Sequence, residues 1–226
     1  MKSAINAIVY FILGISVFIG LPAVSFGLSR IREYVSDPVR LLYTLSMGLA
    51  TLCVVLFVPN QGRGYGAGEK IVRRQNIAIL FFQITSLLDV TLSPFSDAHH
   101  LLVLPGSVVL RSCGLALTLV GYFFMSWSVV ALGRQFSLKV TIQAGHELVT
   151  GGPYKIIRHP RYLGILLFLL GVAGVFRSFI GVTLALLTLV IVIWRIKDEE
   201  ALLKAEFAGK WDAYIANSWK IIPFLY

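Results

Sequence analysis

Charged side chains are scarce in this sequence, and their scarcity indicates the class of protein. Asp, Glu, Lys and Arg make up 14% of the 226 residues, whereas soluble domains carry about 25%. Hydrophobic residues make up 57%, and the mean hydropathy is +0.82. These values exclude an ordinary soluble domain and indicate an integral membrane protein.

Acidic residues are the scarcer charge type, with 11 Asp and Glu against 20 Lys and Arg. The net charge of +9 could indicate nucleic-acid binding, but the positions of the basic residues argue against it. Five lie between Arg134 and Arg161 and five between Arg195 and Lys220, and both groups flank hydrophobic segments. Cytoplasmic loops of membrane proteins carry such an excess. We therefore expect contacts with membrane lipids and no nucleic-acid partner.

Cysteine is nearly absent, and the signatures of several common catalytic sites are missing. Cys53 and Cys113 both lie in apolar segments, with neither a disulfide framework nor metal-ligand spacing. The sequence has no P-loop, no Gly-x-Ser-x-Gly and no Gly-rich dinucleotide fingerprint. We expect no metal site.

Long hydrophobic segments are abundant. A membrane helix needs about 20 apolar residues, and five to six segments approach that length. We expect spans at 4–28 (broken by Pro22), 41–58, 76–92 and 106–132, then a short helical hairpin at 163–176 and 179–194. The remainder, 195–226, has the pattern of an amphipathic helix before Pro223. The predicted fold is an all-α, polytopic integral membrane protein.

We divide the chain at residue 132, with N-terminal spans that admit a substrate (1–132) and a functional core (133–226). Placing the core's polar loop and C-terminal tail in the cytoplasm satisfies the positive-inside rule for most loops. It also places the loop 29–40, with three arginines, outside the cell, which fits the rule poorly.

The polar segment, residues 146–164, interrupts the hydrophobic sequence of the core. Its Gly151-Gly152-Pro153 run predicts a turn in which backbone can approach a ligand closely. Pro160 suits the first position of the helix that follows, because it has no N–H to leave unpaired. His159, directly before that proline, is biased toward an extended conformation.

This geometry gathers Arg158, His159, Tyr162 and backbone N–H groups at one helix N-terminus near the membrane surface. Such a place suits an anionic group such as a carboxylate. The alternative is an interfacial belt, in which Arg, Lys and Tyr anchor the spans. The turn glycines and the His-Pro pair favour a functional site over the belt.

The C-terminal tail begins with a second polar group. Arg195 and Glu199 are four residues apart and share one helix face. Glu200 heads an apolar stripe at helical spacing, formed by Leu203, Phe207, Trp211 and Tyr214. Burying a carboxylate without a partner is costly. We therefore expect the stripe to dock this helix under the polar segment, with its acidic residues beside His159 and Tyr162.

Polar residues inside the predicted spans are weaker candidates. Gln83 and Asp89 lie in the third span, where intramembrane polar groups are often functional. Asp89 lies near the end of that span, so an interfacial position is equally consistent. Arg111 and Arg177 have the positions of interface anchors.

The two polar groups closely resemble the signature of the isoprenylcysteine carboxyl methyltransferase family. The matching motifs are His146-x-Leu-Val-Thr-x-Gly-x-Tyr154, Arg158-His-Pro-x-Tyr162-x-Gly164 and Arg195-x-x-x-Glu199-Glu200, with a helical hairpin before the last. The resemblance covers roughly residues 132–224. The first four spans match only as hydrophobic helices.

The resemblance implies a membrane enzyme that uses S-adenosylmethionine and releases S-adenosylhomocysteine, with 133–226 as its methyltransferase core and the cofactor on the cytoplasmic side. Cofactor contacts would come from His146, Leu148, Val149, Tyr154, His159 and Tyr162. Glu199 would hold the amino group of the cofactor, and Arg195 would face the reacting end of the substrate. We add Arg158 as a third candidate catalytic residue. The spacing from Arg195 favours Glu199 for its role, whereas the apolar stripe points to Glu200; we choose Glu199.

We expect a methyl transfer to an amphiphilic, lipid-like acceptor. The favoured acceptor is an isoprenylcysteine-type carboxylate. A phospholipid amine and a small thiol are alternative acceptors. A membrane reductase is a second class of enzyme, which binding of reduced nicotinamide would identify. A non-enzymatic transporter or assembly protein is a third class. The concentration of polar residues on one face, with no polar line across the spans, argues against that class.

Overall fold

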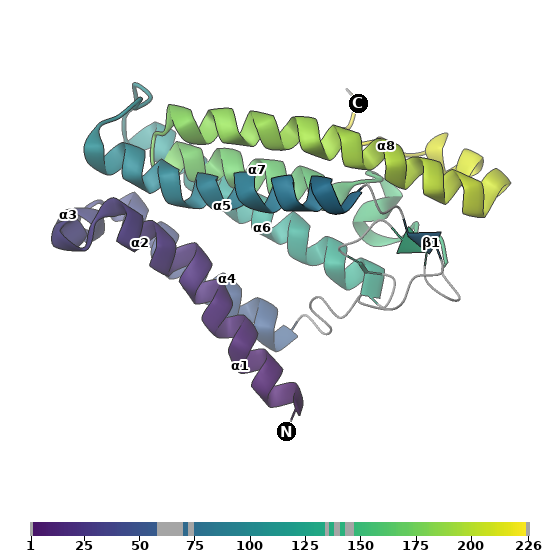
Figure 1. Ribbon diagram of the computed structural model, residues 1–226, viewed down its shortest axis with the longest axis horizontal. Coiled ribbons are helices and arrows are strands. Elements are labelled where there is room, and N and C mark those ends of the chain that lie inside the picture. The colour runs from purple at the N-terminus through teal and green to yellow at the C-terminus, as the bar shows by residue number, and fades with distance from the viewer. Residues whose placement is uncertain are drawn as a thin grey trace.

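The computed structural model describes residues 2–57, 70–71, 75–133, 136–137, 141–142 and 147–224. Its elements in chain order (Figure 1) are α1 (Lys2–Ile15), the π-turn η1 (Ser16–Gly20), α2 (Leu21–Phe26), the short 3-10 helix η2 (Leu28–Arg30), α3 (Ile31–Ser36), α4 (Pro38–Phe57), β1 (Lys70–Ile71), α5 (Gln75–His99), α6 (Val108–Leu132), β2 (Thr141–Ile142), the 3-10 helix η4 (Gly152–Lys155), α7 (Pro160–Val175) and α8 (Phe179–Ile215). The two-residue strands β1 and β2 pair antiparallel.

Five helices within the described ranges are long and apolar enough to cross a membrane. They are Ile5–Phe26, which runs from α1 through α2, and α4, α5, α6 and α8, while α7 is a shorter apolar helix. A tight turn at 176–178 joins α7 and α8 into a hairpin. The predicted all-α, polytopic fold with five to six membrane helices is therefore confirmed.

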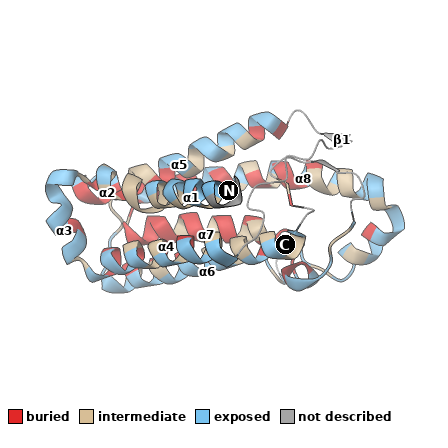
Figure 2. Ribbon diagram, turned by 90° about the horizontal axis from the view of Figure 1, so that it is seen from below, coloured by how far each residue is buried: buried red, intermediate tan, exposed pale blue. Residues whose placement is uncertain are grey.

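The C-terminal helices form the body of the molecule. Figure 1 shows α5, α6, α7 and α8 side by side along the long axis, with α1 and α4 diverging from them toward the N-terminus. The helix α6 packs along α7, and α5 packs along α8. Buried residues concentrate on α7 (Figure 2), whose Phe168, Leu169 and Val172 lie in the hydrophobic core. The start of α7, where the polar segment ends, thus belongs to a helix that neighbouring helices hold on several sides.

Pro22 does not break the first span, contrary to the sequence-based expectation. A π-turn precedes it, in which the N–H of Leu21 donates to the carbonyl of Ser16. This wider turn lets Pro22 occupy the first turn of α2, where a missing N–H costs least. The expected loop after residue 92 is also helical as far as His99, with Pro94 inside α5.

The second helix of the hairpin and the C-terminal amphipathic helix are one element rather than two. The helix α8 (Phe179–Ile215) continues without a break from the hairpin to a kink at Ala208, a stretch of about 44 Å at 1.5 Å per residue. The hydrocarbon core of a membrane is about 30 Å thick. The helix therefore extends well beyond the membrane before it kinks at Ala208, where φ is +38°. This continuity places Arg195, Glu199 and Glu200 on the same helix as the second arm of the hairpin.

Glycines bring the backbones of α6 and α7 into direct contact. A Cβ atom added to Gly121 of α6 would lie 2.4 Å from the backbone nitrogen of Phe168, and one added to Gly171 of α7 would lie 2.4 Å from that of Thr118. Such small residues at helix interfaces allow the close packing that stabilises helix pairs in membranes. The contact sets the position of α7, and with it the position of the polar segment.

A buried ion-pair cluster joins the helices at the end of the molecule where α5 finishes. Asp97 of α5 lies 2.9 Å from a guanidinium nitrogen of Arg40 and 2.9 Å from one of Arg111. Arg177, in the turn between α7 and α8, lies 3.3 Å from the same carboxylate. Arg111 is 7% exposed, so its expected role as an interface anchor is wrong. It is a buried partner of Asp97, since a carboxylate in this position needs a compensating charge.

Asp89 is also buried rather than interfacial. Its exposed fraction is 0%, and its Oδ1 accepts a hydrogen bond of 2.8 Å from the hydroxyl of Ser93, one helical turn away. The interfacial position is therefore wrong. The helix α5 continues past Asp89 as far as His99, and Asp89 packs against α8, where a Cβ atom on Gly181 would lie 3.1 Å from its Oδ1.

The close contact between α6 and α7 predicts that Gly171→Ala destabilises the protein. The added methyl group would meet backbone atoms of α6, which cannot rotate away, so we expect a loss of about 1–3 kcal/mol. Thermal unfolding in detergent should show a midpoint several degrees lower than that of the parent. Gly209→Ala is the matched control, because its Cβ would have no neighbour within 4 Å. Equal midpoints for the two variants would contradict this account of the interface.

Candidate functional site

The polar segment leads into α7 as its sequence predicts. Pro160 is the first residue of α7, and His159 stands directly before the helix with φ −124° and ψ 55°. This ψ value is less extended than the sequence suggests. Gly152 has φ +59°, and a Cβ there would lie 3.3 Å from Ala131 of α6. The turn therefore requires glycine, both for its backbone conformation and for its close approach to α6.

The described residues after α8, 216–224, are called the tail from here on. They fold back onto the polar segment, which the sequence did not predict. The N–H of Arg158 donates to the carbonyl of Trp219 at 2.7 Å, and the N–H of Trp219 donates to that of Ile156 at 2.8 Å. The N–H of His159 donates to the carbonyl of Lys220 at 3.0 Å. The backbone N–H groups of Arg158 and His159 are therefore bonded to the tail. Those of Tyr162 and Leu163 are bonded to the carbonyl of His159.

Glu200 supplies the anion that the polar segment attracts. Its Oε1 accepts a hydrogen bond of 3.0 Å from Nε of Arg158 and lies 3.2 Å from Nε2 of His159. Its Oε2 lies 3.4 Å from Nζ of Lys220. Charge-assisted hydrogen bonds of this kind are among the stronger ones in proteins. The carboxylate of Glu200 therefore holds α8, the polar segment and the tail together.

Glu199 faces a different group, although it is adjacent in sequence. The hydroxyl of Tyr162 donates to Oε2 of Glu199 at 2.9 Å, and Nε of Arg195 donates to the same hydroxyl oxygen at 3.2 Å. Arg195 and Glu199, which share a face of α8, are thus linked through a phenol that α7 contributes. The geometry gives the two glutamates separate positions, with Glu200 in the docking contact and Glu199 beside Tyr162.

Tyr154 lies on η4 and is 8% exposed. The hydroxyl of Tyr214 donates to the carbonyl of Tyr154 at 2.7 Å, so the apolar stripe of α8 contacts the turn. Burial raises the pKa of the Tyr154 phenol far above its usual range, and the negative charge of Glu199 raises it further. Tyr154 therefore stays protonated and neutral at any physiological pH, and it cannot act as a general base.

The remaining predicted cofactor residues lie in the polar segment before η4. Leu148 and Val149 are half-buried. His146 lies outside the described residues.

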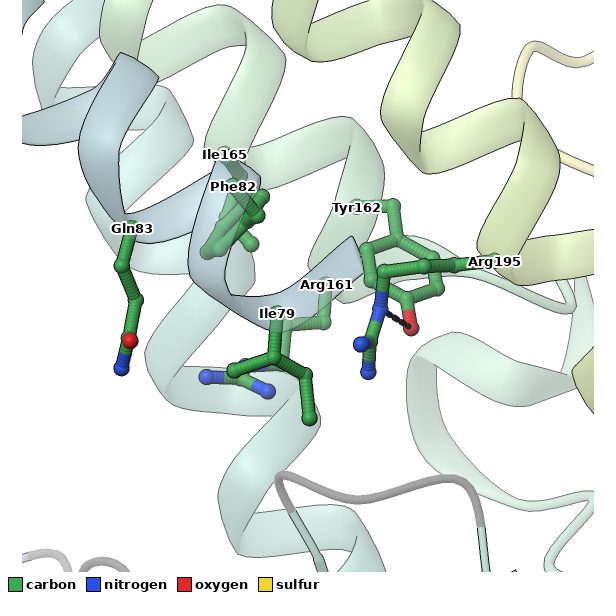
Figure 3. A pocket seen from close by; sticks show the side chains of 7 residues that line it. All are labelled: Ile79, Phe82, Gln83, Arg161, Tyr162, Ile165 and Arg195. Carbon is green, nitrogen blue, oxygen red and sulfur yellow. Dashed lines mark hydrogen bonds between the residues drawn. The ribbon is translucent and has the colours of Figure 1, made fainter. Parts of the chain in front are cut away.

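A pocket adjoins the group formed by Tyr162 and Arg195 (Figure 3). It is lined by Ile79, Phe82 and Gln83 of α5, Arg161, Tyr162 and Ile165 of α7, and Arg195 of α8. Arg161 occupies the variable position of the His-Pro-x-Tyr motif, and sequence reasoning passed over it for that reason. Gln83 stood out only as a polar residue inside a span.

Asp198 is a second residue that sequence reasoning missed. It is 7% exposed, and its Oδ2 accepts a hydrogen bond from the side-chain amide of Gln75 at the start of α5. No local pattern marks this contact, because the two residues lie 123 positions apart.

Comparison with known proteins bears on this part of the chain. The model of the Isoprenylcysteine carboxyl methyltransferase (ICMT) family matches residues 114–205. A probable protein-S-isoprenylcysteine O-methyltransferase from Oryza sativa subsp. indica is 27% identical over 119 residues, which cover 50% of this chain and 60% of the relative. The protein-S-isoprenylcysteine O-methyltransferase of Schizosaccharomyces pombe is 31% identical over 124 residues, or 52% of this chain and 51% of the relative. The chain thus spans about half to three fifths of these relatives.

A solved structure extends the comparison to the first spans. The structure of the eukaryotic intramembrane Ras methyltransferase ICMT without a monobody matches with a TM-score of 0.55 and 18% sequence identity. The match covers 98% of this chain and 86% of that chain. The resemblance that the motifs carry is thus confirmed, with residues 114–205 matching the ICMT family and the chain as a whole sharing the membrane fold of ICMT.

Proposed function

We propose that this protein is an integral membrane methyltransferase that transfers a methyl group from S-adenosylmethionine to the carboxylate of an isoprenylcysteine-type acceptor. The observation that carries the proposal is the hydroxyl of Tyr162, which joins Arg195 and Glu199 where α7 and α8 meet. This group lies within the segment that matches the ICMT family. The family match favours methyl transfer over the reductase and the transporter.

The residues of the site fit S-adenosylmethionine by their chemistry. The carboxylate of Glu199 suits the ammonium group of the cofactor. The rings of Tyr154 and Tyr162 suit its sulfonium, since aromatic faces attract cations. Leu148 and Val149 offer apolar contacts. When bound, the cofactor supplies an electrophilic methyl group on a sulfur that leaves as a neutral thioether.

The residues of this chain would position the reactants rather than move a proton. A free carboxylate has a pKa of about 3.3–3.7, so it is already ionised at neutral pH. Arg195 would orient this carboxylate, while Tyr162 fixes the guanidinium and Glu199 relative to each other. Transfer of the methyl group to an oxygen of this carboxylate would give a methyl ester and S-adenosylhomocysteine.

The charges at the site favour a carboxylate over the other two acceptors. An amine is protonated at neutral pH and would have to lose that proton before it could accept a methyl group, and a thiol would likewise have to lose its proton. Arg195 would attract an anionic acceptor and repel a protonated amine.

Arg158 and His159 have supporting positions in this proposal. Both bind Glu200, so Arg158 acts by holding the tail against the polar segment and is a positioning residue. We assign the site to the cytoplasmic face of the membrane, because basic residues are concentrated in the polar segment and along the part of α8 beyond the membrane.

We expect the parent protein to bind S-adenosylhomocysteine and Glu199→Gln to bind it about 10- to 100-fold more weakly, since a hydrogen bond to a charged group is worth about 1.5–3 kcal/mol. Calorimetry on the detergent-purified protein measures both affinities. Asp212→Asn is the control, because this exposed carboxylate lies beyond the kink of α8. A folded, monodisperse parent that does not bind would contradict the proposal.

The docking role of Glu200 gives a separate expectation. Glu200→Gln keeps the size of the side chain but removes the charge that Arg158, His159 and Lys220 share. We expect the amide protons of Arg158 and Trp219 to exchange with solvent about 10-fold faster, because their hydrogen bonds depend on the docked tail. Hydrogen exchange followed by mass spectrometry measures this change. Exchange as slow as in the parent would assign the docking to other contacts.

A further inference from the structure

The pocket between α5, α7 and α8 has two kinds of wall (Figure 3). Ile79, Phe82 and Ile165 form an apolar wall. Gln83, Arg161 and Arg195 supply polar groups, and Figure 3 shows their nitrogen atoms turned toward the same side of the pocket. A pocket of this composition fits the polar end of an amphiphile, with its apolar part against the hydrophobic wall.

Arg161 and Arg195 each pack a guanidinium group against an aromatic ring, that of Phe136 for Arg161 and that of Tyr162 for Arg195. The guanidinium carbon of Arg161 lies 4.7 Å from the centre of the Phe136 ring. Arg40, Arg111, Arg158 and Arg177 each form an ion pair with a carboxylate. The ring contact holds the guanidinium group of Arg161 in place at the pocket, since a cation is attracted to an aromatic face.

The charged residues that line the pocket are both cations. Arg161 and Arg195 are two of its seven lining residues, and the other five are uncharged. In the proposed function Glu199, bonded to Tyr162, is the partner of the ammonium group of the cofactor. Both guanidinium groups would attract an anionic group of a ligand in the pocket. In the proposed function the acceptor carries that anion.

We infer that Arg161 is a specificity-determining residue, which binds the acceptor carboxylate together with Arg195 and makes the site selective for anionic acceptors. This inference rests on the proposed function and goes beyond it by assigning a second cation to acceptor recognition. Two guanidinium groups can each donate to one oxygen of a carboxylate, which holds the anion in a defined orientation. The apolar wall of the pocket receives the first carbons of the acceptor's hydrocarbon chain.

The test compares two probes that differ only in charge. N-acetyl-S-farnesylcysteine carries the carboxylate, and its carboxamide is a neutral analogue of the same shape. Calorimetry with the full chain in detergent, saturated with S-adenosylhomocysteine, gives the affinity for each probe. We expect Arg161→Gln to weaken binding of the acid about 10- to 100-fold and to leave binding of the amide unchanged.

Two further variants complete the comparison. Arg161→Lys keeps the charge but loses the planar donor pair, so the acid should bind with intermediate affinity. Lys197→Gln is the matched control, because it removes an exposed cation from α8 next to Arg195. This variant should bind both probes as the parent does.

The outcomes separate the inference from the proposed function. Equal weakening of both probes by Arg161→Gln would assign Arg161 to the structure of the pocket, and no weakening of either would make it an interface anchor. If the parent binds S-adenosylhomocysteine, either of these results overturns the inference and leaves the proposed function standing. If the parent does not bind S-adenosylhomocysteine, the proposed function is overturned. A preference for the acid over the amide that is lost in Arg161→Gln would even then show that Arg161 recognises an anion.

Discussion

A half-buried carboxylate that needs cationic partners organises the functional end of this molecule. Glu200 binds Arg158 and His159 from the polar segment and lies close to Lys220 from the tail. Because α8 is helical here, fixing Glu200 also fixes the direction of its neighbour Glu199. That carboxylate meets Tyr162 one turn into α7. A docking contact thus determines the geometry of the adjoining site.

The rest of the fold holds α7 in the place that this contact requires. Glycines bring α6 against α7 along their length, and the Asp97 cluster ties α4, α5 and α6 to the turn after α7. Both contacts fix how the helices are aligned along one another, since packed backbone atoms and buried charges tolerate little movement. The polar segment is therefore presented from a rigid scaffold at one end of the helices.

Hydropathy predicted the helices, because the need to bury hydrocarbon is a property of local composition. The start of α7 at Pro160 and the docking of the α8 stripe were also local patterns, and the structure contains both. The placement of the acidic residues beside His159 and Tyr162 was also predicted, but other contacts between distant residues were beyond the sequence. The burial of Arg111 depends on Asp97, and the tail forms backbone hydrogen bonds with residues 156–159. No local signal in the sequence marks either contact. Arg161 shows the same limit, since its importance comes from a pocket that three helices form.

The most direct test of the account is the product of the reaction. The purified protein, given S-adenosylmethionine labelled in its methyl group and N-acetyl-S-farnesylcysteine, should form a labelled product that releases methanol in alkali, as a methyl ester does. Its carboxamide analogue should yield no such product. Label transferred in an alkali-stable form, or no transfer by protein that binds S-adenosylhomocysteine, would contradict carboxylate methylation as the activity of this site.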